Sequence, residues 1–260
     1  MFDYSFSYTD LEYYLLLVVR MSCFIYVAPF FSDRDVPRRV KSGLSLMLAY
    51  IVYHSVNPHE MVTYSTVIGY STLVLKEALA GLMIGYGANI CTQIVQMAGK
   101  IADMEIGLSM VQLMDPMTRE STGFTGTLYQ YAVMLIMFAT NLHHYVLRAF
   151  IESYRLIPVG GELFRSDTIV RAVVRFMGDY IAISFSFCLP IVASMLILNA
   201  VLGILAKTAP QVNLFTVGMQ LKILTGLSIL FITIGVLPSV SEYIFNEMKA
   251  MMTVMIESMT

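Results

Sequence analysis

The sequence predicts an all-α integral membrane protein, built from about six helices in one domain over residues 1–260. Of the 260 residues, 57% are hydrophobic and only 13% are charged, and the mean hydropathy is +0.72. Soluble domains carry about 25% charged residues. The apolar residues gather in long stretches, most of them without Asp, Glu, Lys or Arg, and no Gly/Ser-rich linker divides the chain.

Six apolar stretches are the candidate helices. In chain order they cover residues 11–31, 42–59, 78–99, 121–147, 180–206 and 223–241. A transmembrane helix needs about 20 predominantly apolar residues, and these stretches approach or exceed that length. Residues 1–10 contain acidic and no basic side chains, so a cleaved secretion signal is not expected.

The positive charges conflict with a simple six-pass topology. The positive-inside rule places the basic residues after the first stretch in the cytoplasm, and strict alternation then places residues 148–179 outside, although that connection holds five Arg. Either one apolar stretch is a re-entrant hairpin, or partner subunits hold the helices. Within this connection, Ser166 is expected to begin an amphipathic helix that lies at the membrane interface.

A polar segment separates the last two apolar stretches, and we call it the polar island. Backbone of irregular structure at membrane depth persists only where protein buries it or where it borders water. The island is therefore the first candidate for function. Its candidate residues are Lys207, Pro210, Gln211, Asn213, Phe215 and Gly218.

A stripe of small and polar residues recurs every four positions in the third stretch. The helix-packing stripe consists of Glu77, Gly81, Gly85, Asn89 and Gln93. Residues four apart share one helical face, and small residues at this spacing let another helix approach closely. The neighbour is either a helix of the same chain or another subunit. Glu77 is either a functional intramembrane charge or a charge at a helix end.

Methionines are frequent in residues 97–117, which end at Asp115-Pro116, a pair that stops a preceding helix. Methionine is flexible and fills irregular gaps. Two interpretations stay open: a Met-rich loop in a Met-rich protein, or a deformable apolar seal across a pore.

Several function classes are not expected. The net charge of −2 offers no basic surface for nucleic acid. The three Cys and four His show no metal-ligand spacing, and no phosphate-binding loop or nucleophile elbow is present. We therefore expect no enzymatic activity, no cofactor and no metal.

Motifs in a fixed order along the chain resemble those of one family. They include Arg20, Pro29 and Arg39 near the first helix, Glu77 to Gly81 with Gly85, Gly99 to Asp103, Asn141 to His144, and Pro210 to Gly218. Together they resemble the FliR family of export gate subunits, which serves flagellar type III secretion and has an injectisome counterpart. The resemblance runs nearly from end to end. Met219-Gln220 departs from it, because relatives commonly have a proline there.

The resemblance implies a gate subunit of the bacterial inner membrane, in the flagellar basal body. It would contact membrane lipid, form bent helical hairpins, and assemble with FliP and FliQ into a helical complex that FlhB engages and unfolded flagellar proteins cross. The family's loop after the central helix is a plug, which corresponds here to Gly107, Leu108, Ser109, Met110, Val111, Leu113, Met114, Asp115 and Pro116. The alternatives are an injectisome gate subunit, a small-solute transporter with its site near Pro210 and Asn213, and a passive scaffold.

Overall fold

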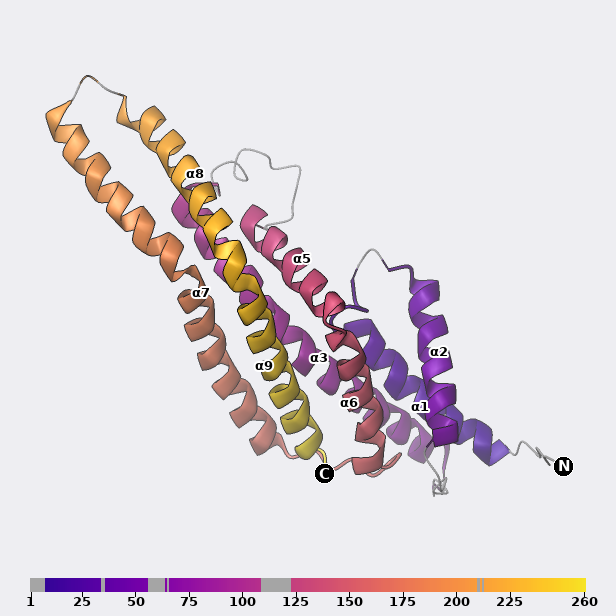
Figure 1. Cartoon of the computed structure of the whole chain (residues 1–260). Coiled ribbons are helices and arrows are strands. Elements are labelled where there is room, and N and C mark those ends of the chain that lie inside the picture. The colour runs from indigo at the N-terminus through magenta and orange to yellow at the C-terminus, as the bar shows by residue number, and fades with distance from the viewer. Residues whose placement is uncertain are drawn as a thin grey trace. The chain divides into compact units, whose positions relative to one another are not determined.

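The computed structural model describes residues 8–33, 36–55, 64, 66–108, 123–209, 211 and 213–260 (Figure 1). All regular secondary structure in these residues is helical, which confirms the predicted all-α class. The helices are α1 (Tyr8–Val27), α2 (Arg38–Ser55), α3 (Val67–Ile106), α5 (Phe124–Ala139), α6 (Leu142–Leu156), α7 (Ser166–Thr208), α8 (Leu214–Thr233), the 3₁₀ helix η1 (Ile234–Val236) and α9 (Leu237–Glu257).

Three segments of the described residues are long and apolar enough to cross a membrane: Val67–Ile106, Ser166–Thr208 and Thr216–Glu257. At 1.5 Å per residue, the 43-residue helix α7 is about 65 Å long. The hydrocarbon core of a bilayer is only about 30 Å thick. Each of these segments is therefore longer than one crossing requires.

The predicted helix over 121–147 is wrong as a single element. Helix α5 ends before Thr140, and α6 begins at Leu142. Asn141 between them has φ 58°, in the left-handed region, which Asn tolerates better than most residues. One left-handed residue is enough to interrupt the i to i−4 hydrogen bonds, although the stretch is apolar and uncharged on both sides.

The predicted interfacial helix from Ser166 is also wrong as a separate element, because it continues into the next apolar stretch as the single helix α7. No residue between the predicted interfacial helix and the stretch 180–206 breaks α7, and Pro190 lies inside it.

The stretch 223–241, predicted as one helix, is instead divided. The 3₁₀ helix η1 interrupts it, and α9 begins just before Pro238, which has no backbone N–H to donate.

The described chain divides into two compact units. Unit 1 comprises 1–91, 141–175 and 245–260, and unit 2 comprises 92–140 and 176–244. That the two units together form the single domain expected over 1–260 stays a prediction. In unit 1, the rings of Phe24 and Phe150 stack with centroids 3.7 Å apart, and both side chains are fully buried. The core of this unit therefore joins α1 to α6.

Unit 2 is held by apolar contacts and by a few polar bonds between helices. The Tyr129 hydroxyl lies 2.7 Å from Thr233 Oγ1, and Ser184 Oγ donates to the Ile94 carbonyl oxygen at 3.1 Å. Hydrogen bonds between helices stabilise their packing in an apolar environment. They join α5 to α8 and α7 to α3 within this unit.

Candidate functional site: the base of the loop after helix α3

The first element of the candidate site is a close approach between two glycines of unit 2. A Cβ placed on Gly99 in α3 would overlap Cα and N of Gly126 in α5. Only residues without side chains allow two helix backbones to come this close. The sequence provides glycine at both positions, and α3 therefore lies directly against the first turn of α5.

A carboxylate reinforces the same contact one turn further along α3. Asp103, which is 2% exposed, accepts hydrogen bonds from the Thr125 backbone N–H at 3.2 Å and from the Thr125 hydroxyl at 2.5 Å. The first N–H groups of a helix have no intrahelical partner, and α5 has no side-chain cap of its own. Asp103 thus caps α5 from a different helix, and a negative charge there is favoured by the helix dipole.

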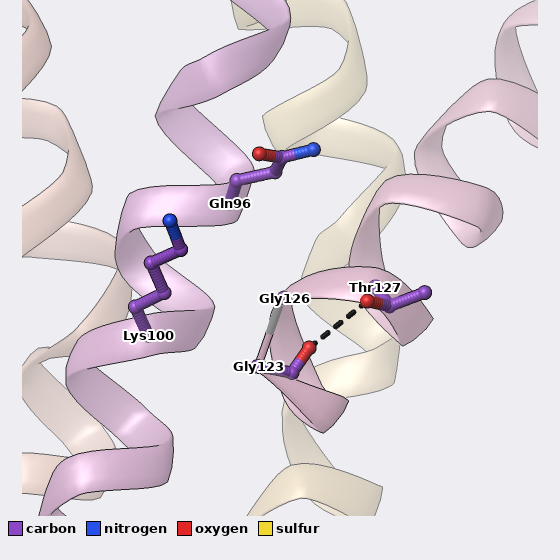
Figure 2. A pocket seen from close by; sticks show the side chains of 5 residues that line it. All are labelled: Gln96, Lys100, Gly123, Gly126 and Thr127. Carbon is purple, nitrogen blue, oxygen red and sulfur yellow. Dashed lines mark hydrogen bonds between the residues drawn. The ribbon is translucent and has the colours of Figure 1, made fainter. Parts of the chain in front are cut away.

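Figure 2 shows a pocket beside this contact, lined by Gln96 and Lys100 of α3 and by Gly123, Gly126 and Thr127. Thr127 Oγ1 donates to the Gly123 carbonyl oxygen at 3.0 Å. Gln96 Nε2 also donates to Gln130 Oε1, one turn further into α5. The end of α3 and the start of α5 are therefore joined by backbone contact, by a carboxylate cap and by an amide pair.

The loop predicted as a plug begins at this contact. Gly107 ends α3 with φ +91°, a conformation that L side chains rarely adopt, and its N–H donates to the Asp103 carbonyl oxygen at 3.1 Å. Leu108 follows it. The remaining predicted plug residues lie outside the described residues: Ser109, Met110, Val111, Leu113, Met114, Asp115 and Pro116.

Four residues of the helix-packing stripe face α1 within unit 1. A Cβ on Gly81 would overlap the Arg20 carbonyl oxygen, and one on Gly85 would lie 3.1 Å from the Phe24 carbonyl oxygen. Asn89 Nδ2 donates to the Val27 carbonyl oxygen at 2.7 Å. The fifth residue, Gln93, is half-buried in unit 2. The described neighbour of the glycines is thus a helix of the same chain.

Glu77, the first residue of the stripe, belongs to a buried ionic cluster. It binds Arg20 of α1, whose Nε lies 2.5 Å from Glu77 Oε2. Arg20 also binds Glu162, and both Glu side chains are 0% exposed. The Arg20 guanidinium carbon lies 4.6 Å from the ring centroid of Tyr154. Burial raises the pKa of the Tyr154 phenol, so the ring faces Arg20 in its neutral form.

Arg20, Asp103 and Glu162 are functional residues that the sequence patterns alone do not single out. A signal for Arg20 is present, because it is the single charged residue between Glu12 and Asp33. An ionisable residue inside an apolar stretch usually has a partner. The partner Glu162 lies more than a hundred residues away, in a connection with no periodic pattern, so the pairing is not readable from spacing.

The polar island lies at the turn between α7 and α8 (Figure 1). Lys207 is exposed in the last turn of α7, Gln211 is exposed in the turn, and Phe215 belongs to the first turn of α8. Asn213 caps α8 by accepting from the Thr216 N–H at 3.5 Å. Gly218 is buried beside Leu202, and Pro210 lies outside the described residues. Helix α8 continues without a break through Met219 and Gln220.

Comparison with known proteins decides the family. The sequence profile of the bacterial export proteins, family 1, matches residues 11–248. The chain belongs to this export family. The match includes residues of both units and nearly all of the described helices. The predicted resemblance to the FliR family is thereby confirmed.

Three relatives in the export family carry the name flagellar biosynthetic protein FliR. The protein of Bacillus subtilis (strain 168) is 29% identical over 235 residues, which cover 90% of each chain. That of Escherichia coli (strain K12) is 25% identical over 238 residues, 91% of this chain and 90% of the relative. That of Buchnera aphidicola subsp. Baizongia pistaciae is 24% identical over 260 residues, 99% and 100% respectively.

Family and structure together identify a membrane-protein component of a bacterial export apparatus. Membership of the export family indicates a role in export, and the three long apolar segments indicate a membrane protein. Within the described residues, no group of three His, Cys, Asp or Glu side chains is placed to hold a metal ion. What the arrangement offers is helix contacts and an anchored loop.

Proposed function

We propose that the chain is a structural and gating subunit of the flagellar type III protein export gate, in the bacterial inner membrane at the flagellar basal body. It assembles with FliP and FliQ, is engaged by FlhB, and forms part of the channel for unfolded flagellar proteins. The flagellar assignment is supported by the names of relatives that match about 90% of the chain or more.

The single observation that carries the gating role is the anchored base of the loop 107–122. Gly99 against Gly126 and Asp103 bonded to Thr125 hold the end of α3 and the start of α5 together. The loop therefore leaves and re-enters at one fixed place, while its own residues include Leu, Val and three Met between 108 and 117. An apolar constriction closes a pore to ions by excluding water.

Large exposed apolar side chains support assembly with other membrane subunits. In α8, Phe231 is 78% exposed and Ile232 is 73% exposed. The segment Thr216–Glu257, which includes most of α8, is longer than one bilayer crossing, so part of it lies outside the hydrocarbon core, where exposed apolar side chains would be in contact with water. Partner helices of FliP and FliQ would cover them there, and membrane lipid would cover the remainder.

Deleting residues 110–114 tests the plug. We expect ion leakage across the inner membrane to rise while export of flagellar proteins continues, because the seal is lost and the helices that build the gate remain. A matched variant replaces 110–114 with an equally long Gly/Ser sequence. It keeps the loop length and removes the apolar seal, so it should leak as well.

The outcomes separate the proposal from its alternatives. Leakage at the wild-type level in both variants contradicts the plug and supports a passive scaffold. Restored motility in a strain that lacks its own flagellar gate subunit supports flagellar cargo, whereas secretion restored only in an injectisome strain contradicts it.

A further inference from the structure

The buried ionic cluster of unit 1 contains more negative than positive charge. Arg20 Nη2 donates to Glu77 Oε1 at 3.1 Å and to Glu162 Oε1 at 2.5 Å, and Arg20 Nε binds Glu77 Oε2 at 2.5 Å. One guanidinium is thus shared by two carboxyl groups. If both carboxyl groups were ionised, the cluster would carry a net charge of −1 where all three side chains are 0% exposed.

Among the described residues, no ionisable group other than Arg20 forms an ion pair with Glu77 or Glu162. Lys76 of α3 is half-buried and directs Nζ to the backbone carbonyl oxygen of Glu162, at 3.4 Å, and not to a carboxylate. The remaining groups that interact here are uncharged at neutral pH: Tyr154 of α6, with Tyr13 and Cys23 of α1. An uncompensated charge in an apolar interior is strongly unfavourable.

One carboxyl oxygen of the cluster has no hydrogen-bond partner. Glu162 Oε2 is fully buried and receives no hydrogen bond from the described residues. The residue as a whole is 1% exposed, so solvent does not reach this oxygen. A buried carboxylate oxygen without a donor loses its hydration and gains nothing in return. A proton on the pair of carboxyl groups cancels the net charge, and an unpaired oxygen of a neutral carboxyl group costs less to bury than one of a carboxylate.

A metal cation fits this position less well than a proton. Hard cations are bound by several oxygen ligands, and three of the four carboxyl oxygens already bind Arg20. The fourth, Glu162 Oε2, is a single ligand. The described residues also contain no group of three His, Cys, Asp or Glu that could hold a metal ion.

We propose that Glu77 and Glu162 hold one proton between them and bind Arg20 as a neutral cluster, which latches residues 157–165 onto α1 and α3. The two carboxyl groups interact with each other as well as with Arg20. The latched backbone is bound at two more points. Arg20 Nη1 donates to the Ile157 carbonyl oxygen at 3.0 Å, and the Gly160 N–H donates to Glu77 Oε1 at 2.9 Å.

The latch is built from residues of unit 1 alone, and it does not depend on the export function.

Infrared spectroscopy of the full chain in detergent tests the proton directly. At neutral pH we expect the band of a protonated, buried carboxyl group, which shifts in deuterium oxide and disappears in both Glu162→Gln and Glu77→Gln. The matched control is Glu152→Gln, which removes a carboxylate of the same unit that is 62% exposed and should leave the band unchanged. A wild-type chain without the band, or a band that survives in both cluster variants, overturns the proposal.

Thermal unfolding gives a second, independent readout. Glu162→Gln should keep the wild-type midpoint at neutral pH, since an amide resembles the protonated carboxyl. A midpoint clearly lowered by Glu162→Gln means that the charged carboxylate is required and overturns the proposal. So does a wild-type midpoint that rises with sodium concentration at constant ionic strength, because it indicates a bound cation.

Discussion

The carboxylate of Asp103 in α3 caps the first turn of α5 by accepting from both the N–H and the hydroxyl of Thr125. These two residues lie on either side of the loop that we propose as the plug. Their bond therefore fixes the distance between the two ends of that loop, whatever conformation the loop itself adopts.

Asp103→Asn tests the importance of this cap. The amide keeps the shape of the side chain and the Oδ1 acceptor, but it loses the negative charge at the start of α5 and replaces Oδ2, which also accepts from the Thr125 N–H, with an NH₂ group. We expect the free energy of unfolding of the chain in detergent to fall by about 2 kcal/mol. Ser186→Ala is the control, because this exposed hydroxyl bonds only to its own helix. An unchanged free energy in Asp103→Asn would show that the cap does not hold the loop base.

Gly99→Ala tests the close approach of α3 and α5. The added Cβ overlaps backbone atoms of Gly126, which cannot rotate away as a side chain could, so the helices must separate. We expect a loss of about 1–3 kcal/mol in the free energy of unfolding. Gly178→Ala in α7 is the matched control, since nothing lies within 4 Å of its added Cβ. That variant should be more stable by about 0.5–1 kcal/mol, and equal effects of both substitutions would contradict the contact.

The two glycines of the helix-packing stripe should differ in their tolerance of Ala. At Gly81 the added Cβ overlaps the Arg20 carbonyl oxygen, whereas at Gly85 the nearest atom, the Phe24 carbonyl oxygen, is 3.1 Å away. Gly81→Ala should therefore lower the unfolding temperature in detergent by more than Gly85→Ala does. The reverse order would show that α1 does not pack against α3 as the structure describes.

Asn213→Ala tests the cap of α8 in the polar island. Replacing an N-cap Asn with Ala costs about 1 kcal/mol, because an N–H of the first turn loses its acceptor. Gln211→Ala, an exposed residue of the same turn, is the control and should leave the unfolding temperature unchanged. A lower unfolding temperature in Asn213→Ala alone would show that the polar island has a structural role. Equal unfolding temperatures for the wild type and Asn213→Ala would contradict that role.

Sequence reasoning located the helices better than it located their ends. Apolar stretches mark α1 and α2 to within a few residues, because each is bounded by charged or polar segments. The break at Asn141 is not marked in this way, since the residues on both sides are uncharged. The continuity of α7 through residues 178–180 is likewise invisible to a search for uncharged stretches.

The candidate site was predictable in part. The spacing of Gly81 and Gly85 indicates a helix contact without naming its partner, and the structure supplies α1. The Met-rich loop stands out by composition, whereas the pair of residues that holds its base, Asp103 and Thr125, does not. Asp103 and Thr125 are 22 residues apart on different helices, and only the folded chain brings them together. The same holds for Arg20 and Glu162.

The most direct test of the export gate is co-expression of the tagged chain with its FliP and FliQ partners, followed by detergent extraction and native mass determination. The proposed function predicts one defined complex that contains all three proteins, because exposed apolar side chains outside the hydrocarbon core need partner helices. A stable, monodisperse chain that purifies alone while both partners are produced but unbound would contradict it.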